Sequence, residues 1–223
     1  MEQLKRISII TGHYGSGKTN VAVNLALKLH KSGKKVIIVD LDIVNPYFRT
    51  ADFKELLEAQ GIQVITPTFA NTNLDIPALP AQINTIFDQQ DSYIVIDVGG
   101  DDAGAIALGR YAHEIIKQDY DMFYVINERR YQTRNPQDAI ALLHDIEACA
   151  RVKATKLINN TNLGALTTVQ TLTDSFEFAD KISELTKLPI AFSCFNEACL
   201  NQEIDKQGDF ILPVEIFVKP FYE

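Results

Sequence analysis

The sequence predicts a single α/β domain in which a mainly parallel β-sheet carries helices on both faces. Short runs of β-branched residues recur along the chain without the polar alternation of a half-exposed sheet, and segments with helical patterns separate them. Continuous apolar strands are typical of sheets that are covered on both faces. Strands that alternate with helices form parallel sheets through right-handed crossovers.

The expected strands end in polar residues. Residues 7–10 form the first strand and lead into a glycine-rich turn, and the others are residues 36–39, 93–96, 123–126 and 157–158. Ligands of parallel sheets bind beyond the carboxyl ends of the strands. The residues that follow the last four strands are therefore expected to meet at one rim: Asp40, Asp97, Asn127 and Asn159.

Helical patterns fill the intervals between the strands. Residues 20–30 are apolar on most sides, which indicates a buried helix, and Gly33 is expected to end it. Residues 210–222 are apolar but interrupted by prolines, so we expect an extended segment at the sheet edge. Residues 66–80 are also rich in proline and are expected to form a surface loop or a partner-facing segment. Further helices are expected over residues 53–60, 78–87, 106–116, 136–150 and 169–186.

Composition limits the possible classes of function. The 223 residues are 46% hydrophobic and 22% charged, which is ordinary for a globular protein, and we expect residues 1–223 to form one domain. The net charge of −8 argues against nucleic acid as a partner. No apolar run approaches a membrane span or a signal sequence, so no membrane anchor is expected. Three sparse cysteines fit a reducing compartment, and the cytoplasm is the expected location.

Residues 12–19, GHYGSGKT, satisfy the phosphate-loop pattern G-x-x-x-x-G-K-[ST] between a predicted strand and a predicted helix. Glycines let the backbone N–H groups turn inward toward phosphate oxygens, and the helix N-terminus adds positive charge. Lys18 is expected to reach the β- and γ-phosphates, and the Thr19 hydroxyl to bind Mg²⁺. The expected nucleotide-binding residues here are Gly12, His13, Tyr14, Gly15, Ser16, Gly17, Lys18, Thr19 and Asn20.

Asp97 and the residues after it complete this expected phosphate site. A carboxylate at the end of a buried strand can hold a water molecule on Mg²⁺, and the backbone of Gly99 or Gly100 can donate an N–H to the γ-phosphate. Asp102 is expected to cap a helix that begins near Ala105. The sequence therefore predicts a site for a nucleoside triphosphate and Mg²⁺.

With these segments, VDLD at residues 39–42 and IDVGG at residues 96–100, the sequence resembles the MinD/ParA-type nucleotide-binding family. Its relatives include the nitrogenase iron protein, the arsenite-pump ATPase, Mrp-type cluster carriers, and dethiobiotin- and cobyrinic-acid-type synthetases. The resemblance spans roughly residues 7–208, because residues 189–197 are similar to the family's last strand and loop on the nucleotide side.

The resemblance implies roles for individual residues. Asp42 matches the carboxylate that orients the attacking water, so it and Lys18 are the expected catalytic residues. Asp40 matches an acid near the metal, and Asp97, together with Thr19, matches the Mg²⁺ side of the site. These positions imply an ATPase whose cofactor is Mg²⁺.

The resemblance also implies a base-binding position. Asn159 or Asn160 matches the Asn that recognises the base in this family. Asn162 stands where guanine-specific relatives carry an Asp, and an amide, which both donates and accepts, selects guanine less strongly. ATP is therefore expected rather than GTP.

His13 departs from the pattern of the family's dimeric ATPases. Those proteins carry a second lysine at this position, which reaches the phosphates of the partner subunit. Histidine is shorter and about neutral at pH 7. Either hydrolysis is slow, or another cation takes the place of that lysine, for which the candidates are Arg49, Arg110, Arg129 and Arg130.

Three functions remain open on these residues. The first is an ATP-dependent switch, in which segments 42–49 and 97–102 respond to the nucleotide and a partner protein or a second copy of the chain reads the change. The second is a small-molecule synthetase or kinase whose acceptor binds near Arg129, Arg130 and Arg134. The third is a regulatory module that binds nucleotide and scarcely hydrolyses it.

Two further groups of residues carry open interpretations. The basic segment 128–134 is either a functional rim loop or a solvated loop. Residues 45–49 contain two aromatic residues and are interpreted first as a buried loop anchor and second as a partner surface. Cys194 and Cys199 lack the Cys-x-x-Cys spacing of cluster carriers, so no metal or cluster ligation is expected from them.

Overall fold

The computed structural model describes residues 4–43, 49–67, 81–196 and 211–218. Eight strands form one sheet in the order β3-β2-β4-β1-β5-β6-β7-β8, and all of the neighbouring pairs are parallel. The strands are β1 (Ile7–Gly12), β2 (Lys35–Leu41), β3 (Gln63–Ile65), β4 (Ser92–Val98), β5 (Tyr120–Ile126), β6 (Lys156–Asn159), β7 (Ile190–Asn196) and β8 (Ile211–Val214). The predicted parallel α/β fold is confirmed.

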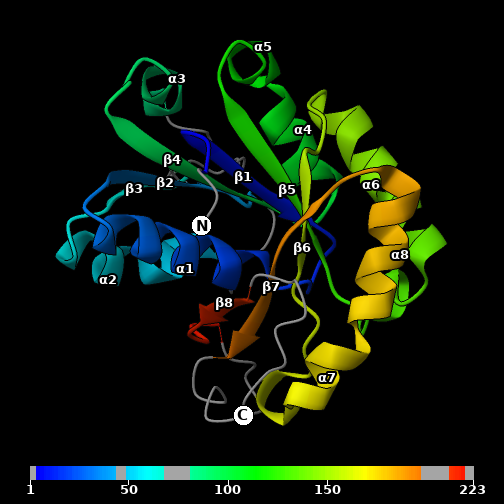
Figure 1. Cartoon of the computed structure of the whole chain (residues 1–223). Coiled ribbons are helices and arrows are strands. Elements are labelled where there is room, and N and C mark those ends of the chain that lie inside the picture. Colours follow the sequence, from blue (N-terminus) through cyan, green and yellow to red (C-terminus); the bar gives the residue numbers. More distant parts are fainter. Residues whose placement is uncertain (1–3, 44–48, 68–80, 197–210, 219–223) are drawn as a thin grey trace, which may run out of the picture.

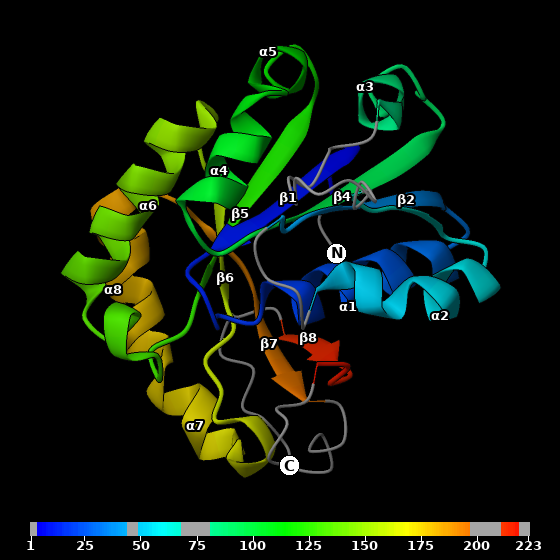
Figure 2. The same ribbon diagram turned by 180° about the vertical axis from the view of Figure 1, so that it is seen from behind.

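Helices cover both faces of this sheet (Figures 1 and 2). The described helices are α1 (Lys18–Lys31), α2 (Lys54–Ala59), α3 (Gln82–Ile86), α4 (Asp102–Gly109), α5 (Ala112–Ile115), α6 (Pro136–Ala150), α7 (Val169–Asp174) and α8 (Phe176–Thr186), with 3₁₀ turns η1 (Thr50–Phe53), η2 (Tyr131–Thr133) and η3 (Gly164–Leu166).

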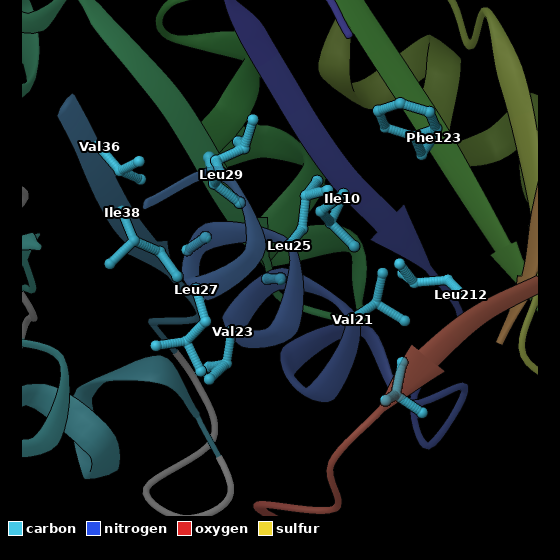
Figure 3. Packing of buried hydrophobic residues seen from close by; sticks show 14 of the residues in the cluster. Ile10, Val21, Val23, Leu25, Leu27, Leu29, Val36, Ile38, Phe123 and Leu212 are labelled. Atoms are coloured by element: carbon cyan, nitrogen blue, oxygen red, sulfur yellow. The ribbon is translucent and has the colours of Figure 1, made fainter. Parts of the chain in front are cut away.

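Alternation along each strand divides the core into two layers. In β2, Val36 and Ile38 pack with α1 and α2, whereas Ile37 and Val39 pack with α3, α4 and α5. In Figure 3, Leu25 of α1 and Ile10 of β1 point toward one another in the first layer. Because both faces are covered, the strands carry apolar side chains on both sides, and this is the pattern that the sequence shows.

The helix and strand predictions hold with specific corrections. The helix expected over residues 169–186 is broken at Ser175, whose hydroxyl donates to the Leu172 carbonyl at 2.6 Å and accepts from the Asn159 amide at 2.8 Å. The helix expected to begin near Ala105 begins at Asp102 instead, because the side chain of Asp101, not of Asp102, accepts the Gly104 N–H at 2.9 Å. A break after Gly109 then separates α4 from α5.

Two edge strands complete the comparison. The three-residue strand β3 was not predicted, because a segment this short has no readable period. The edge segment expected over residues 210–222 is confirmed in part: β8 covers residues 211–214 with Pro213 within it on the last strand of the sheet, and residues 210 and 219–222 lie outside the described residues. Some predictions lie outside the described residues. They concern residues 45–48, residues 68–80, residue 197 and Cys199.

Candidate functional site

The phosphate-loop residues lie between β1 and α1, at the carboxyl end of the central strand. The backbone at Gly15 (φ +74°) and Gly17 (φ +88°) is left-handed, a conformation that glycine adopts without steric cost. At Gly12, a Cβ would stand 2.5 Å from the Val125 carbonyl oxygen of β5. The loop therefore requires its glycines, as the predicted anion cradle would.

Lys18 is folded back over this loop and is only 7% exposed. Its Nζ donates to the His13 carbonyl at 3.0 Å. A Cβ at Gly100 would stand 2.6 Å from the same Nζ, so the turn after β4 packs closely against the lysine. Burial lowers the pKa of Lys18, while the nearby carboxylates of Asp97 and Asp42 raise it. The carboxylates thus offset part of the cost of burying the lysine charge beside the loop.

Asp97 is the carboxylate at the centre of the site. It is 1% exposed at the end of β4, and its Oδ2 accepts the Thr50 hydroxyl at 2.8 Å. Its Oδ1 is buried and has no hydrogen-bond partner among the described residues. Burial raises the pKa of Asp97 to about 6, against the opposing effects of the Lys18 charge and of the nearby Thr50 and Thr19 hydroxyls. A buried carboxylate oxygen without a partner, close to the Thr19 hydroxyl, fits the oxygen ligands that Mg²⁺ prefers.

Asp40 ties the segment that leaves β2 to the turn that follows it. Its Oδ1 accepts the Asp42 N–H at 2.8 Å and its Oδ2 accepts the Ala51 N–H at 2.9 Å. Burial, and then the charge of Asp97, raises the pKa of Asp40 to about 7. Asp40 and Asp97 are paired in register on β2 and β4. Both oxygens of Asp40 already accept backbone hydrogen bonds, and its role as a metal ligand stays a prediction.

Asp42 lies between the end of β2 and the turn after β4. It is 9% exposed, and a Cβ at Gly99 would stand 3.1 Å from its Oδ1. The structure therefore brings Asp42, Asp97 and Lys18 together at the phosphate loop, as the sequence predicted. The catalytic role of Asp42 stays a prediction.

The asparagines of the predicted base site are engaged within the protein. Asn159 is fully buried. Its Nδ2 donates to the Ser175 hydroxyl, and its Oδ1 accepts from the N–H and the hydroxyl of Thr161. Asn160 donates from Nδ2 to the Ser16 carbonyl at 2.7 Å and so supports the phosphate loop. Asn162 bonds to the Asn160 carbonyl and to the Gly164 N–H. Recognition of a base by Asn159 or Asn160 stays a prediction.

Asn20 is the last of the residues predicted to bind nucleotide at the phosphate loop, and its side chain contacts the segment after β8. Its Oδ1 accepts the N–H groups of Phe217 and Val218 at 2.9 and 3.0 Å. Tyr14, in contrast, is 59% exposed in the loop, and Ser16 is buried with a hydroxyl that has no partner in the described part of the chain.

Thr50 and Arg49 were not predicted as parts of the carboxylate centre. Thr50 is fully buried on Asp97, and Arg49, 8% exposed, lowers the pKa of Asp40 by its charge. No periodic pattern marks residues 49–50. They reach the carboxylates because the segment after β2 turns back and the Ala51 N–H donates to Asp40. The only available signal was their position in the segment after the conspicuous pair Asp40 and Asp42.

The arginines after β5 differ in their surroundings. The Arg129 guanidinium lies 3.7 Å from a Glu128 carboxylate oxygen and 3.9 Å from one of Asp174. The Arg130 side chain lies against the phosphate loop at Gly15. Arg134 is exposed after η2, and Arg110 is exposed at the end of α4. Of the candidate cations, Arg130 is the one that the structure places on the loop itself.

Larger metal clusters and membrane spans are not seen in the part of the chain that the structure describes. Three or more His, Cys, Asp or Glu side chains do not gather into a metal site there. Mg²⁺ takes few protein ligands and draws on water and substrate phosphate, so Thr19 and Asp97 suit it without such a cluster. None of the described helices is both long enough and apolar enough to cross a membrane. Cys194 is buried, which raises the pKa of its thiol.

A glycine-formed anion loop at the end of the central parallel strand, with a buried lysine and a strand-end carboxylate, defines a P-loop nucleotide-binding domain. Residues 7–163 match the family model described as the CobQ/CobB/MinD/ParA nucleotide binding domain. The chain belongs to this family, and the resemblance noted in the sequence is confirmed.

Solved structures share the fold at low sequence identity. The signal recognition particle 54 kDa protein of Aeropyrum pernix, solved with GDP, superposes with a TM-score of 0.58 at 18% identity, covering 86% of this chain and 42% of that chain. FtsY of Thermotoga maritima gives 0.55 at 19% identity, covering 88% and 64%, and chloroplast FtsY of Physcomitrella patens gives 0.60 at 13%, covering 98% and 63%. These similarities establish the P-loop fold.

One curated relative matches over a short stretch. Tyrosine-protein kinase YwqD of Bacillus subtilis is 40% identical over 53 residues, which are 24% of this chain and 22% of that protein. The chain thus spans about a fifth of the kinase and less than half of the Aeropyrum protein.

Proposed function

We propose that this chain is a Mg²⁺-dependent ATPase that acts as a nucleotide-dependent switch for a partner protein in the cytoplasm. One observation carries the proposal. The Thr50 hydroxyl donates to Asp97 at 2.8 Å and so links the segment after β2 to the carboxylate beside Lys18 and Thr19. A change at Asp97 on nucleotide binding would therefore be felt in the segment that follows Asp42, and a partner protein or a second copy of the chain could read that change.

Each residue of the site has a separate role in the proposed mechanism. On binding, Lys18 would exchange the His13 carbonyl for phosphate oxygens, and the loop amides would hold the rest of the phosphate chain. Thr19 and Asp97 would hold Mg²⁺, which neutralises charge on the phosphates when it is bound. Asp42, beside Gly99, would accept a hydrogen bond from the attacking water and orient it.

ATP is the proposed nucleotide rather than GTP. Asn162 stands where a carboxylate would accept hydrogen bonds from guanine, and its side chain is already bonded to Asn160 and Gly164. The GDP in the Aeropyrum structure belongs to that protein. Parallel titrations with ATP and GTP test the choice.

Phosphoryl transfer to a bound acceptor is the second candidate. The short match to a tyrosine kinase and the exposed arginines after β5 favour it. It predicts negligible turnover of ATP until the acceptor is added, whereas a switch ATPase hydrolyses ATP alone or with its partner protein. A regulatory module would bind ATP and stay inactive in every mixture.

Calorimetry and single-turnover hydrolysis with purified protein separate these functions. We expect uptake of ATP that requires Mg²⁺, its loss in Lys18→Ala, and slow hydrolysis without an acceptor. Absence of uptake of either purine triphosphate by the wild-type protein contradicts the whole proposal. Hydrolysis that appears only with a small-molecule acceptor favours the second candidate over the switch.

A further inference from the structure

We infer that Arg130 is the cation with which this chain engages the terminal phosphate of a bound triphosphate, from the β5 side of the site. The inference rests on the proposed function and deepens it, because it assigns a residue that acts in addition to Lys18. It is carried by the contact of Arg130 with the phosphate loop, by the hydrogen-bonded turn that places its backbone there and by the absence of an ion-paired carboxylate among the described residues.

The contact is made at a residue with no side chain. A Cβ at Gly15 would stand 3.4 Å from Arg130 Nε, 3.5 Å from Cζ and 3.7 Å from Cδ. The backbone of Gly15 is part of the anion cradle, and its positive φ disfavours any larger residue. The guanidinium therefore lies directly against the loop that would hold the phosphates.

The turn that carries Arg130 is fixed by buried groups. The Arg130 N–H donates to the Asn127 carbonyl at 3.2 Å, and the Thr133 N–H donates to the Arg130 carbonyl at 3.0 Å. The Thr133 hydroxyl donates to the Asn127 carbonyl at 2.8 Å, and the Asn127 Oδ1 accepts the Arg129 N–H at 3.0 Å. Asn127 and Thr133 are at most 2% exposed. The end of β5 thus sets the position of the Arg130 backbone, from which the exposed side chain reaches the loop.

Charge distinguishes Arg130 from its neighbours. Arg129 lies within 4 Å of carboxylates of Glu128 and Asp174, whereas no carboxylate of the described residues forms an ion pair with Arg130. His13 does not supply a second cation, because burial and the charge of Lys18 lower its pKa, although a hydrogen bond with Gln132 raises it. A phosphate in the loop would give Arg130 a counterion, and a planar guanidinium matches phosphate geometry.

The test compares Arg130→Gln with Arg130→Lys and the wild-type protein. We expect Arg130→Gln to weaken Mg²⁺-ATP binding or slow single-turnover hydrolysis at least tenfold, while ADP affinity changes less than twofold. Arg130→Lys should recover part of the loss. Lys181→Gln, which removes one exposed positive charge from α8, should match the wild-type protein in both assays.

Several outcomes overturn the inference. If Arg130→Gln behaves as the wild-type protein toward ATP, or loses ATP and ADP affinity equally, Arg130 only stiffens the loop or does nothing there. A wild-type protein that takes up no Mg²⁺-ATP overturns the proposed function, and this inference with it. Mixing Arg130→Gln with Lys18→Ala chains tests whether Arg130 acts in its own chain, because recovered hydrolysis would mean that it acts across a dimer.

Discussion

Asn160 shows how one side chain can carry two interpretations that experiment separates. The sequence resemblance assigns it to the base, whereas in the structure its Nδ2 donates to the Ser16 carbonyl at 2.7 Å, from a site that is 7% exposed. Gly17 lies so close that any side chain there would collide with the same amide. Asn160 is therefore a structural support of the phosphate loop.

Asn160→Ala should weaken binding of ATP and of inorganic tripolyphosphate by the same factor. Loss of one buried hydrogen bond is worth on the order of 1 kcal/mol, or roughly fivefold to tenfold in affinity. Competition with a fluorescent nucleotide measures both ligands in one assay. A loss confined to ATP would return Asn160 to the base-binding role that the family resemblance implies.

Asp42→Ala addresses the catalytic residue of the proposed mechanism. We expect single-turnover hydrolysis to fall by about 100-fold, the usual contribution of a positioned acid or base, with little change in ATP affinity. Glu55→Ala, an exposed carboxylate on α2, serves as the control and should leave the rate unchanged. A rate in Asp42→Ala equal to that of the wild-type protein would remove Asp42 from the mechanism.

Residues of the site were predictable where their position follows from the strand pattern. Asp40, Asp97, Asn127 and Asn159 end apolar runs, and parallel pairing brings such ends to one rim. Thr50 was not predictable, because only the closure of the segment around Asp40 brings it to Asp97. The uses of Asn159 and Asn160 within the protein also depend on tertiary contacts.

At the scale of elements, the turn between β4 and α4 packs closely against the phosphate loop. Gly100 has no room for a side chain, since a Cβ would stand 2.6 Å from Lys18 Nζ and 2.7 Å from the Tyr14 backbone nitrogen. The lysine side chain can move aside, but only a shift of the loop backbone would relieve the contact with Tyr14. The close packing of this turn on the loop therefore depends on glycine.

Gly100→Ala should lower ATP affinity by at least tenfold, because the loop must shift to admit the methyl group. Gly33→Ala is the matched control. No atom lies within 4 Å of a Cβ at Gly33, but its φ of +82° strains alanine, so it should lose about 1 kcal/mol of stability and keep its ATP affinity. Urea unfolding and calorimetry on both variants check this. Equal ATP affinity in Gly100→Ala and the wild-type protein would contradict the close packing.

Element boundaries were predicted less well than element types. The pattern over residues 169–186 is helical throughout, yet Ser175, fully buried and bonded to Asn159, ends α7 and restarts the chain as α8. The early start of α4 follows from the Asp101 cap, and sequence alone could not choose between Asp101 and Asp102. In both cases a side-chain hydrogen bond decided the boundary, and a hydrophobic period does not report it.

At the scale of the whole molecule, the buried aspartates of the site lower the free energy of unfolding. Asp40 and Asp97 face each other across β2 and β4 in the interior, and burial raises their pKa values to about 7 and about 6. A fold with no functional site would gain by replacing them. The proposed function accounts for their place in the core, because a divalent ion and the phosphate-loop lysine would offset this buried negative charge.

The sign of the pH dependence follows from these raised values. The folded protein holds the proton of Asp97 up to about pH 6, whereas the unfolded chain releases it near 3.8. The unfolded state therefore binds fewer protons in this window, and the contribution of Asp97 to the free energy of unfolding falls as the pH rises from about 4 to about 6. The raised pKa of Asp97 therefore corresponds to a loss on the order of 3 kcal/mol in the free energy of unfolding.

Asp97→Asn should therefore gain stability over the nucleotide-free wild-type protein as the pH rises. The amide oxygen can still accept the Thr50 hydroxyl, and the ionisable group is gone. Urea unfolding of both proteins at fixed ionic strength between pH 4.5 and 8 measures the difference. Titrating groups remote from Asp97 cancel in it, whereas Asp40, whose pKa the charge of Asp97 raises, adds to it in the same direction. We expect the difference to grow as the pH rises from 4.5 to about 7. A difference that stays constant over this range would mean that Asp97 is already ionised in the folded protein at pH 4.5.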